Sequence, residues 1–215
     1  MSTSAIEARR IAALEEANAG YLARRGEIIR TAAHVFRENG FEASTLRDVA
    51  AALGTDRASL YYYVGSKDEL LHEIVRDALG RDLETAEAVR RSPAPSPEKL
   101  RTLIEAMVSS FVDNYPNMNV YMADLPQIAR QESEWSVDIM ERTRRYQALV
   151  EGIVEDGQAD GTLRDDLAPR LCAFALFGLF NWLHRWFRPG GEWTVEQIAD
   201  AYSKIYLGGY GAAQA

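Results

Sequence analysis

The chain has 215 residues, of which 47% are hydrophobic and 26% are charged, and these proportions exclude a disordered or low-complexity protein. Its single cysteine, Cys172, cannot form a disulfide within the chain and excludes a zinc site built from several cysteines. The net charge is −8, but it is unevenly distributed. Residues 20–70 carry seven Lys/Arg and seven Asp/Glu, whereas residues 71–215 carry 15 Lys/Arg and 22 Asp/Glu. The N-terminal part is therefore neutral, which permits it to bind DNA through a narrow surface.

The N-terminal region is expected to be helical from residue 5 to about residue 39, with an interruption near Gly20. Gly40 is suited to end this helix. No basic-then-apolar signal segment precedes it, because Glu7, Arg9 and Arg10 interrupt the apolar residues, and we therefore expect a cytoplasmic protein. The apolar stripe that supports the helix consists of Leu22, Ile29, Ala32, Ala33 and Phe36.

Further helices are expected after the segment 45–64, and proline and glycine residues separate them. They span residues 66–90, 97–114, 116–124, 134–158, 169–188 and 194–208. No segment has the alternation of a strand, so the predicted fold class is all-α. The most apolar segment, Leu171–Phe187, is too short to cross a membrane and contains Asn181, His184 and Arg185. We therefore expect a buried helix that is shared between subunits, and no membrane partner.

Residues 45–64 carry the start and stop signals of two short helices joined by a tight turn. Thr45 with Asp48 predicts a capping box at the first helix, and Asp56 predicts the cap of the second. Gly54 supplies a left-handed turn between them, and Leu60 anchors the inner face of the second helix. A generic helical hairpin is the alternative, but the coincidence of these signals favours a helix-turn-helix that is followed by a supporting helix.

The outward-facing residues of this motif predict a surface that reads the DNA major groove. Arg57 can donate two hydrogen bonds to a guanine, and the small Ala58 and Ser59 allow close approach. Tyr61 and Tyr62 are suited to phosphates or thymine methyl groups. Thr45 and Lys67 are expected to contact phosphates. Arg47 completes the predicted set, although it is equally well explained as a solvated side chain.

The chain resembles the TetR family of bacterial repressors in residues 24–75. The resemblance rests on Ile28–Phe36 (IIRTAAHVF), Asn39–Phe41 (NGF), Thr45–Ala50 (TLRDVA), Leu60–Tyr62 (LYY) and Ser66–Leu71 (SKDELL). Thr55 stands where the family usually has an aliphatic residue, and Tyr63 replaces a frequent histidine, so the operator sequence stays open. The resemblance implies a helical extension over residues 1–22, a three-helix DNA-binding head over residues 23–68, and a ligand-binding and dimerisation body over residues 69–215.

In this family the last two long helices usually pair with those of a second subunit as a four-helix bundle. The resemblance therefore implies a homodimer on a palindromic operator, because a lone head binds DNA weakly. Ala175 and Gly178 allow helices to approach closely, and the final helix carries an apolar stripe. The alternative is that these residues form core within one subunit. The predicted dimer interface consists of Ala175, Gly178, Ile198, Ala201, Tyr202 and Ile205.

The middle helices hold many large, adaptable side chains, which predict either a solid core or an apolar ligand pocket. The run Arg185–Gly191 (RWFRPGG), followed by Trp193, resembles TetR-like regulators of fatty-acid and steroid catabolism, and this implies an acyl-coenzyme A effector. A drug-like hydrophobic compound is the alternative effector, and a plain helix end is the alternative role of the arginines. The predicted ligand-binding residues are Met107, Phe111, Tyr115, Tyr121, Met122, Trp135, Phe177, Asn181, Trp182, Arg185, Trp186 and Arg188.

The sequence predicts a ligand-released transcriptional repressor and not an enzyme. No nucleophile elbow, phosphate loop, metal-ligand set or paired acid–base group stands out, and no cofactor is expected. Ligand binding is expected to shift the helix 66–90 and thereby lower the affinity of the head for DNA. Activation in place of repression, and a scaffold whose head binds protein, are the alternatives.

Overall fold

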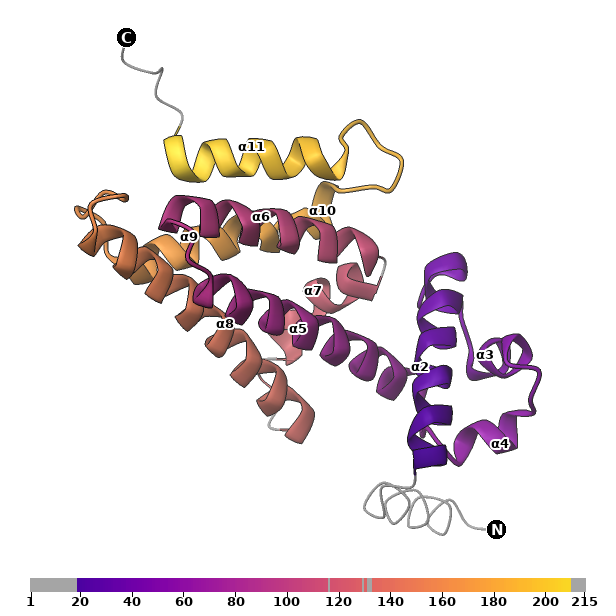
Figure 1. Ribbon diagram of the computed structural model, residues 1–215. Helices are drawn as coiled ribbons and strands as arrows, with labels where there is room; N and C mark the ends of the chain where they lie inside the picture. Colours follow the sequence, from indigo (N-terminus) through magenta and orange to yellow (C-terminus); the bar gives the residue numbers. More distant parts are fainter. Residues whose placement is uncertain (1–18, 116, 129, 131–132, 210–215) are drawn as a thin grey trace. The chain divides into compact units, whose positions relative to one another are not determined.

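The computed structural model describes residues 19–115, 117–128, 130 and 133–209, and every regular element in that part is a helix (Figure 1). The predicted all-α class is confirmed. The chain divides into two compact units, with a boundary between Asp77 and Ala78. The first unit also includes Asn114–Val120. The boundary lies inside α5 (Lys67–Arg91), later along the chain than the expected end of the head at residue 68.

The first unit contains α2 (Ala19–Asn39), α3 (Leu46–Ala52), α4 (Arg57–Tyr61) and the beginning of α5. α3 packs against both α2 and α4. The buried side chains of the first unit come from all of these helices and form one apolar core, which includes Ile28, Phe36, Val49, Leu60 and Leu70. Residues 1–18, where the predicted helix begins, lie outside the described residues.

The predicted helix ends of the first unit are confirmed by their hydrogen bonds. Thr45 and Asp48 form a reciprocal capping box at the start of α3, and the Asp56 side chain accepts the Ser59 amide at 2.8 Å at the start of α4. Gly54 lies between the two helices with φ 63°, where a residue with a side chain would be strained. These local contacts fix the helix-turn-helix geometry before any long-range packing is considered.

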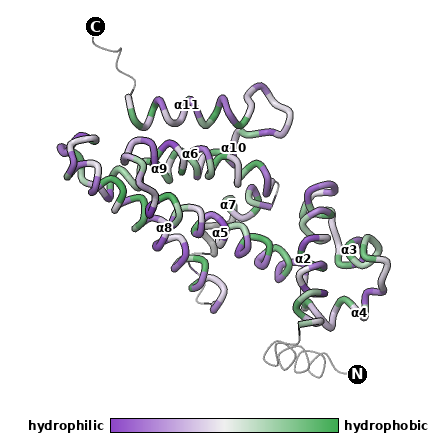
Figure 2. The backbone as a smooth tube through the Cα atoms, in the orientation of Figure 1, coloured by the Kyte–Doolittle hydropathy of each residue, from purple (hydrophilic) through white to green (hydrophobic). Residues whose placement is uncertain are grey.

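The second unit contains the remainder of α5 together with five other complete helices and the end of α7 (Asn117–Ile128). The complete helices are α6 (Ser96–Asp113), α8 (Glu134–Ala159), α9 (Pro169–Asn181), α10 (Leu183–Trp186) and α11 (Val195–Gly208). α6 packs against α8 and α11, and α8 packs against α9. Hydrophobic and hydrophilic stretches alternate along α5, α8 and α11 in Figure 2, as expected for helices that bury one face.

The single helix predicted over residues 169–188 is wrong, because the structure ends α9 at Asn181 and begins α10 at Leu183. In a continuous helix the Arg185 amide would donate to the Asn181 carbonyl. Here that amide donates to Trp182 at 3.0 Å, and the His184 ring nitrogen lies 2.6 Å from the Asn181 carbonyl. The His184 side chain therefore replaces the missing backbone contact. Within the described residues, no helix has both the length and the apolar character needed to cross a membrane.

Gly157 on α8 marks a close crossing inside the second unit. A Cβ atom at this position would lie 2.6 Å from Ser96 Cβ and 2.6 Å from Leu163 Cδ1. We expect Gly157→Ala to lower the free energy of unfolding by about 1–3 kcal/mol in urea titrations, because the added methyl group overpacks the crossing. Gly80→Ala, inside α5, is the control, since the nearest atom to its Cβ position is the flexible end of Arg142 at 3.5 Å, an ordinary van der Waals contact.

The control substitution is expected to raise the free energy of unfolding by about 0.5–1 kcal/mol, because alanine is the better helix former. Both variants are compared at one protein concentration. A gain of stability in Gly157→Ala would contradict the close crossing.

Candidate functional site

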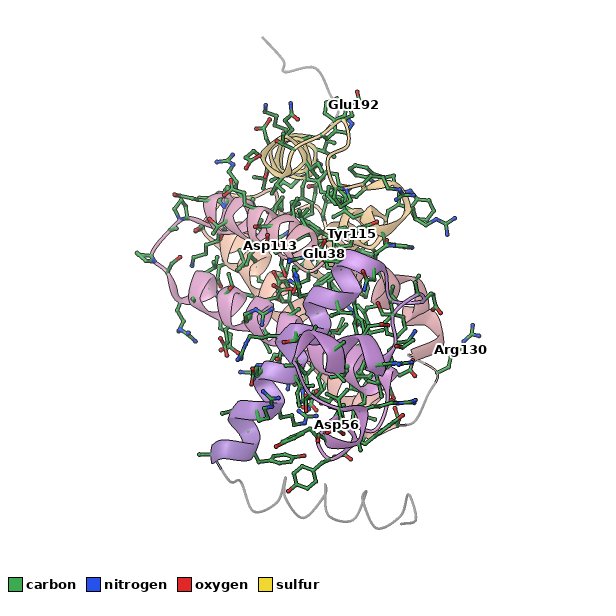
Figure 3. All side chains as sticks on the ribbon, turned by 90° about the vertical axis from the view of Figure 1, so that its right-hand side faces the viewer. Glu38, Asp56, Asp113, Tyr115, Arg130 and Glu192 are labelled. Carbon is green, nitrogen blue, oxygen red and sulfur yellow. The ribbon has the colours of Figure 1, made fainter. Side chains whose placement is uncertain are left out.

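The surface of α4 carries the central residues of the predicted DNA interface. Arg57, Ala58 and Ser59 are all exposed, whereas Leu60, which follows them, is 1% exposed. Asp56, labelled in Figure 3, lies at the surface where α4 begins. The cap at one end and the buried leucine at the other hold three consecutive side chains toward solvent, as a groove-reading helix requires.

Arg57 is held by the aromatic residue one turn later on α4. Its Nη2 atom donates to the Tyr61 hydroxyl at 2.5 Å, and its guanidinium carbon lies 5.2 Å from the centre of the Tyr61 ring. Arg57 is exposed and Tyr61 is half-buried. This pairing restricts the rotamers of the arginine before any partner is bound, and it therefore lowers the entropic cost of binding.

The hydrogen-bond donors that the start of α3 can offer to a phosphate are chiefly backbone amides, because the Thr45 hydroxyl is already hydrogen-bonded. The Thr45 hydroxyl donates to Asp48 Oδ2 at 2.7 Å, and the Thr45 amide donates to the same oxygen at 2.8 Å. These two hydrogen bonds hold the pKa of Asp48 below its usual value. Arg47 is exposed beside them. Because the threonine hydroxyl already has a partner, a phosphate here would be bound chiefly by helix-start amides and Arg47.

Lys67 is engaged within the first unit. Its ammonium group donates to the Phe41 carbonyl at 2.8 Å and lies 4.2 Å from the centre of the Phe41 ring. These contacts join the start of α5 to the segment between α2 and α3. Lys67 therefore fixes that segment, and a phosphate contact would require the ammonium group to leave or share these partners.

Tyr62 and Tyr63 form an aromatic cluster with Tyr21 of α2. The Tyr21 ring stacks on Tyr63 at 5.0 Å between centroids and meets Tyr62 edge-on at 5.5 Å. Tyr62 and Tyr63 are themselves in edge contact at 5.0 Å. Tyr21 is buried, and Tyr62 keeps 39% of its surface exposed. One face of Tyr62 thus packs against the protein while the rest stays available to a partner.

The predicted ligand-binding residues are distributed over both units. Tyr115 belongs to the first unit, and its predicted neighbours on α6, α8 and α9 belong to the second. Phe111 and Tyr121 are buried, and Met107, Met122, Trp135 and Phe177 are half-buried. The remaining five are exposed on α9 and just beyond it, and these are Asn181, Trp182, Arg185, Trp186 and Arg188. The set therefore forms an interior group and a surface group.

Two residues of the interior group, Phe177 and Tyr121, contact polar side chains inside the second unit. Asp82 of α5 shares a hydrogen bond with Ser110 of α6 and lies near Tyr146 of α8. The Tyr146 ring meets Phe177 edge-on at 5.6 Å. Burial raises the pKa of Tyr121 to about 12, against the hydrogen bond that it shares with Thr143. The interior is thus apolar but contains hydrogen-bonding groups, as ligand sites in helical proteins do.

The surface group combines arginines with tryptophans. The Arg185 guanidinium carbon lies 4.9 Å from the centre of the Trp182 ring, and Arg188 Nη1 donates to the Phe187 carbonyl at 2.7 Å. Trp182 and Trp186 are exposed. Arg185 lies beside one exposed indole ring, and Trp186 and Arg188 are exposed within three residues along the chain, so this segment offers cations for phosphates and rings for a stacked base.

The predicted dimer residues lie partly on an exposed apolar face of α9. Ala175 and Gly178 are exposed there, next to Leu171 and Phe174, which are 64% and 47% exposed. On α11, Ala201 is exposed and Tyr202 and Ile205 are half-buried. Ile198 is 4% exposed, so it belongs to the core of its own subunit in this structure. It points inward because α11 packs that side against α6.

Both units match models of one protein family. Residues 28–74 match the model described as bacterial regulatory proteins, tetR family. Residues 93–210 match the model described as tetracyclin repressor-like, C-terminal domain. The chain belongs to the TetR family. It is a TetR-type DNA-binding transcription regulator, so the family and function class predicted from the sequence are confirmed.

The similarity of this TetR-family protein to its relatives extends over both units. It is 30% identical over 191 residues to the HTH-type transcriptional repressor KstR2 of Rhodococcus jostii, covering 88% of this chain and 92% of the relative. The structure of the ketosteroid transcriptional regulator KstR2 of Mycobacterium tuberculosis is 29% identical with a TM-score of 0.72, covering 86% and 94%. The structure of AibR with isovaleryl coenzyme A and operator DNA is 25% identical with a TM-score of 0.69, covering 86% and 98%.

Sequence reasoning missed two residues of this TetR-family head, Tyr21 and Arg25. Arg25 Nη1 contacts Glu73 Oε2 at 3.0 Å and Arg25 Nη2 contacts Glu69 Oε1 at 3.5 Å, which joins α2 to α5. Burial alone would lower the pKa of Arg25, but the hydrogen bond and charge of Glu73 raise it above its usual value. Both residues precede Ile28, where the first of the family motifs begins. Tyr21 lies seven positions before buried Ile28, on the same helical stripe, and that spacing could have identified it.

Asp82 is expected to make the stability of the second unit of this TetR-family protein depend on pH. Burial raises the pKa of its carboxyl to about 6 from 3.8, although the hydrogen bond with Ser110 acts against this. The folded state therefore favours the protonated acid. Its contribution to stability is fully present below about pH 4 and is lost as the pH rises through about 6.

Asp82→Asn is expected to raise the free energy of unfolding near pH 8 by up to about 3 kcal/mol, because each pKa unit corresponds to about 1.4 kcal/mol. The advantage should vanish toward pH 4. Urea titrations at both pH values test this, with exposed Asp77→Asn as a variant that removes the same charge at the surface. A gain that is independent of pH would contradict the assignment.

Proposed function

We propose that the protein is a homodimeric repressor that places α4 of each subunit in the major groove of a two-fold symmetric operator. The observation that carries this proposal is the exposure of Arg57, Ala58 and Ser59 between the Asp56 cap and buried Leu60. Arg57 reads a guanine edge, and Ala58 and Ser59 allow the helix to lie close to the bases. Arg47 and the amides at the start of α3 bind phosphates and set the register.

The proposed dimer uses the exposed face of α9. Leu171, Phe174 and Gly178 follow one another at steps of three or four residues, so they share one side of the helix. An apolar face along a whole helix is costly to leave in water, and a two-fold axis would bury it against its own copy. Ala175 and Gly178 permit close approach of the two α9 helices, and Ala201, exposed on α11, is available to join the contact.

We propose an acyl-coenzyme A thioester as the effector. AibR, whose structure is similar over 86% of this chain, was solved with isovaleryl coenzyme A and operator DNA. In this chain, Arg185 and Arg188 supply cations for phosphates, and Trp182 or Trp186 supplies a stacking surface. The interior group around Phe111 and Phe177 receives the acyl chain. The effector releases DNA because it binds one conformation of the dimer more tightly than the other.

In vitro selection from random duplex DNA tests the DNA-binding proposal. The purified protein is expected to enrich a palindromic sequence and to bind it as a dimer in sedimentation experiments. Its affinity for the selected duplex should fall with rising salt, because phosphate contacts release counterions. Enrichment of no sequence, with the protein folded and dimeric, would favour the scaffold alternative.

The effector proposal is tested on the same selected duplex with acyl-coenzyme A thioesters of increasing chain length. At least one thioester should release the DNA, whereas free coenzyme A and the free acids should not. Arg185→Ala with Arg188→Ala should raise the thioester concentration that is needed, and Arg101→Ala, exposed on α6, serves as the control. Release by an uncharged drug-like compound and by no thioester would support the alternative effector.

A further inference from the structure

Three polar side chains from different helices meet inside the second unit, next to the residues that receive the proposed acyl chain. Asp82 of α5 shares a hydrogen bond with Ser110 of α6. Burial, and then the charge of Asp82, raises the pKa of Tyr146 of α8, so these two groups lie close together. The Tyr146 ring is buried and meets the Phe177 ring edge-on at 5.6 Å. A chain that packs against Phe177 therefore comes next to polar groups.

The neighbours of this polar cluster on α6 are apolar. Phe111 follows Ser110 directly and meets the Phe187 ring edge-on at 5.7 Å. Met107 lies one turn before Ser110, on the same side of the helix, and is half-buried. The cluster is thus a polar spot bordered by apolar side chains. In ligand sites of this kind, the few polar groups determine which ligands are accepted.

The carboxyl group of Asp82 has more hydrogen-bonding capacity than the cluster fills. An ionised carboxylate can accept about four hydrogen bonds, whereas the hydroxyls of Ser110 and Tyr146 each carry a single hydrogen. Within the described residues, the ion pairs of α5 in the second unit are formed by Glu87 and by the arginines that follow it, not by Asp82. The Asp82 side chain is half-buried, so part of it remains accessible.

The ligand group that fits this carboxyl is an uncharged donor. Since the pKa of Asp82 is raised only to about 6, the carboxyl is chiefly ionised at neutral pH and accepts hydrogen bonds. A ketone has no hydrogen to donate. An ammonium group would bring a second full charge into an apolar interior, where one carboxylate compensates poorly for its lost hydration. A hydroxyl group donates one hydrogen at a much lower desolvation cost.

We propose that the acyl group of the effector carries a hydroxyl group, and that Asp82, positioned by Ser110, accepts a hydrogen bond from it. The proposal rests on the acyl-coenzyme A effector proposed above and narrows the effector to hydroxylated acyl thioesters. An unsubstituted chain would remove water from the carboxylate without replacing its hydrogen bonds. The cluster therefore selects against plain fatty-acyl chains as well as for hydroxylated ones.

The test uses pairs of ligands in which a hydroxyl group replaces a methyl group. For example, ω-hydroxydecanoyl-coenzyme A is paired with undecanoyl-coenzyme A, and the pairs are varied in chain length to place the hydroxyl at different depths. Calorimetry on the full-length protein measures the affinity of each thioester. At one chain length or more, the hydroxylated thioester is expected to bind roughly 10- to 100-fold more tightly than its partner, as expected for a hydrogen bond to a charged group.

Substitutions in the cluster show whether Asp82 produces this preference. Asp82→Leu removes the acceptor and should abolish or reverse the preference, whereas Asp82→Asn keeps the shape and should retain roughly a 3- to 10-fold preference. Ser110→Ala should reduce the preference without weakening the binding of the unsubstituted thioester. Asp77→Leu makes the same substitution at an exposed position of α5 and should behave as the wild-type protein. Wild-type affinity for the selected duplex shows that each variant is folded.

The outcomes distinguish the hydroxyl proposal from the effector proposal. Equal affinity within every pair, with the duplex released by both thioesters, would overturn the hydroxyl proposal and leave the effector proposal standing. A preference that persists in folded Asp82→Leu would also overturn it, because another residue would then bind the hydroxyl. Decylammonium that binds more tightly than any hydroxylated thioester, and only when Asp82 is present, would assign this residue to a cation. If no thioester of either series binds, both proposals fail.

Discussion

Replacing Arg57 with alanine is expected to lower the affinity for the selected operator by about 1–3 kcal/mol per half-site. The side chain is exposed on α4 and is oriented by Tyr61, so its removal leaves the core around Leu60 unchanged. The variant should therefore melt at nearly the same temperature as the wild-type protein. Selection with the variant should also show relaxed preference at one base pair of each half-site, because a lost bidentate contact is a lost base preference.

The matched control for this substitution is Arg91→Ala. Arg91 ends α5 in the second unit, its side chain is 71% exposed, and the substitution removes the same charge. It should change operator affinity little at physiological salt, where surface charges farther apart than about 8 Å are screened. An equal loss of affinity for the operator and for random DNA in Arg57→Ala would show that Arg57 contacts phosphate and not a base.

Replacing Tyr21 with alanine is expected to destabilise the first unit by about 2–4 kcal/mol. The Tyr21 ring is buried and contacts both Tyr62 and Tyr63, so its loss leaves a cavity beside the end of α4. Amides of α4 should exchange with solvent faster, and operator affinity should fall even in the fraction that is folded. Hydrogen exchange and operator titration on the same sample measure both effects.

Two variants show whether the effect comes from the aromatic packing. Tyr21→Phe keeps the ring and should retain most of the stability and the operator affinity. Leu22→Ala changes the next residue, which is 46% exposed, and should be close to neutral. If Tyr21→Ala lowered stability but left the ratio of operator to random-DNA affinity unchanged, Tyr21 would be a packing residue without influence on α4.

The features that the sequence predicted well are those set by neighbouring residues. The capping pair Thr45 and Asp48, the turn at Gly54 and the Asp56 cap each depend on residues three or four positions apart. Such contacts form in the same way whatever the rest of the fold does. For this reason the sequence alone predicts the helix-turn-helix, its outward-facing residues and the all-α class.

The features that the sequence missed depend on distant residues. Ile198 fits an apolar stripe equally well whether α11 faces its own subunit or a partner, and packing against α6 decides in favour of its own subunit. The contact of Lys67 with the Phe41 carbonyl joins residues 26 positions apart, which no local pattern could predict. Residues from Leu100 of α6 to Leu207 of α11 line one cavity in the second unit, and no local pattern encodes that separation.

The shortness of α4 has a consequence for how this regulator can diverge. Five residues form less than two turns, so the helix depends on its cap at Asp56, on buried Leu60 and on its packing against α3. Arg57, Ala58 and Ser59 contribute little to folding and can be exchanged without repacking the interior. A gene duplicate could therefore acquire a new target sequence through three codons while it inherits the scaffold intact.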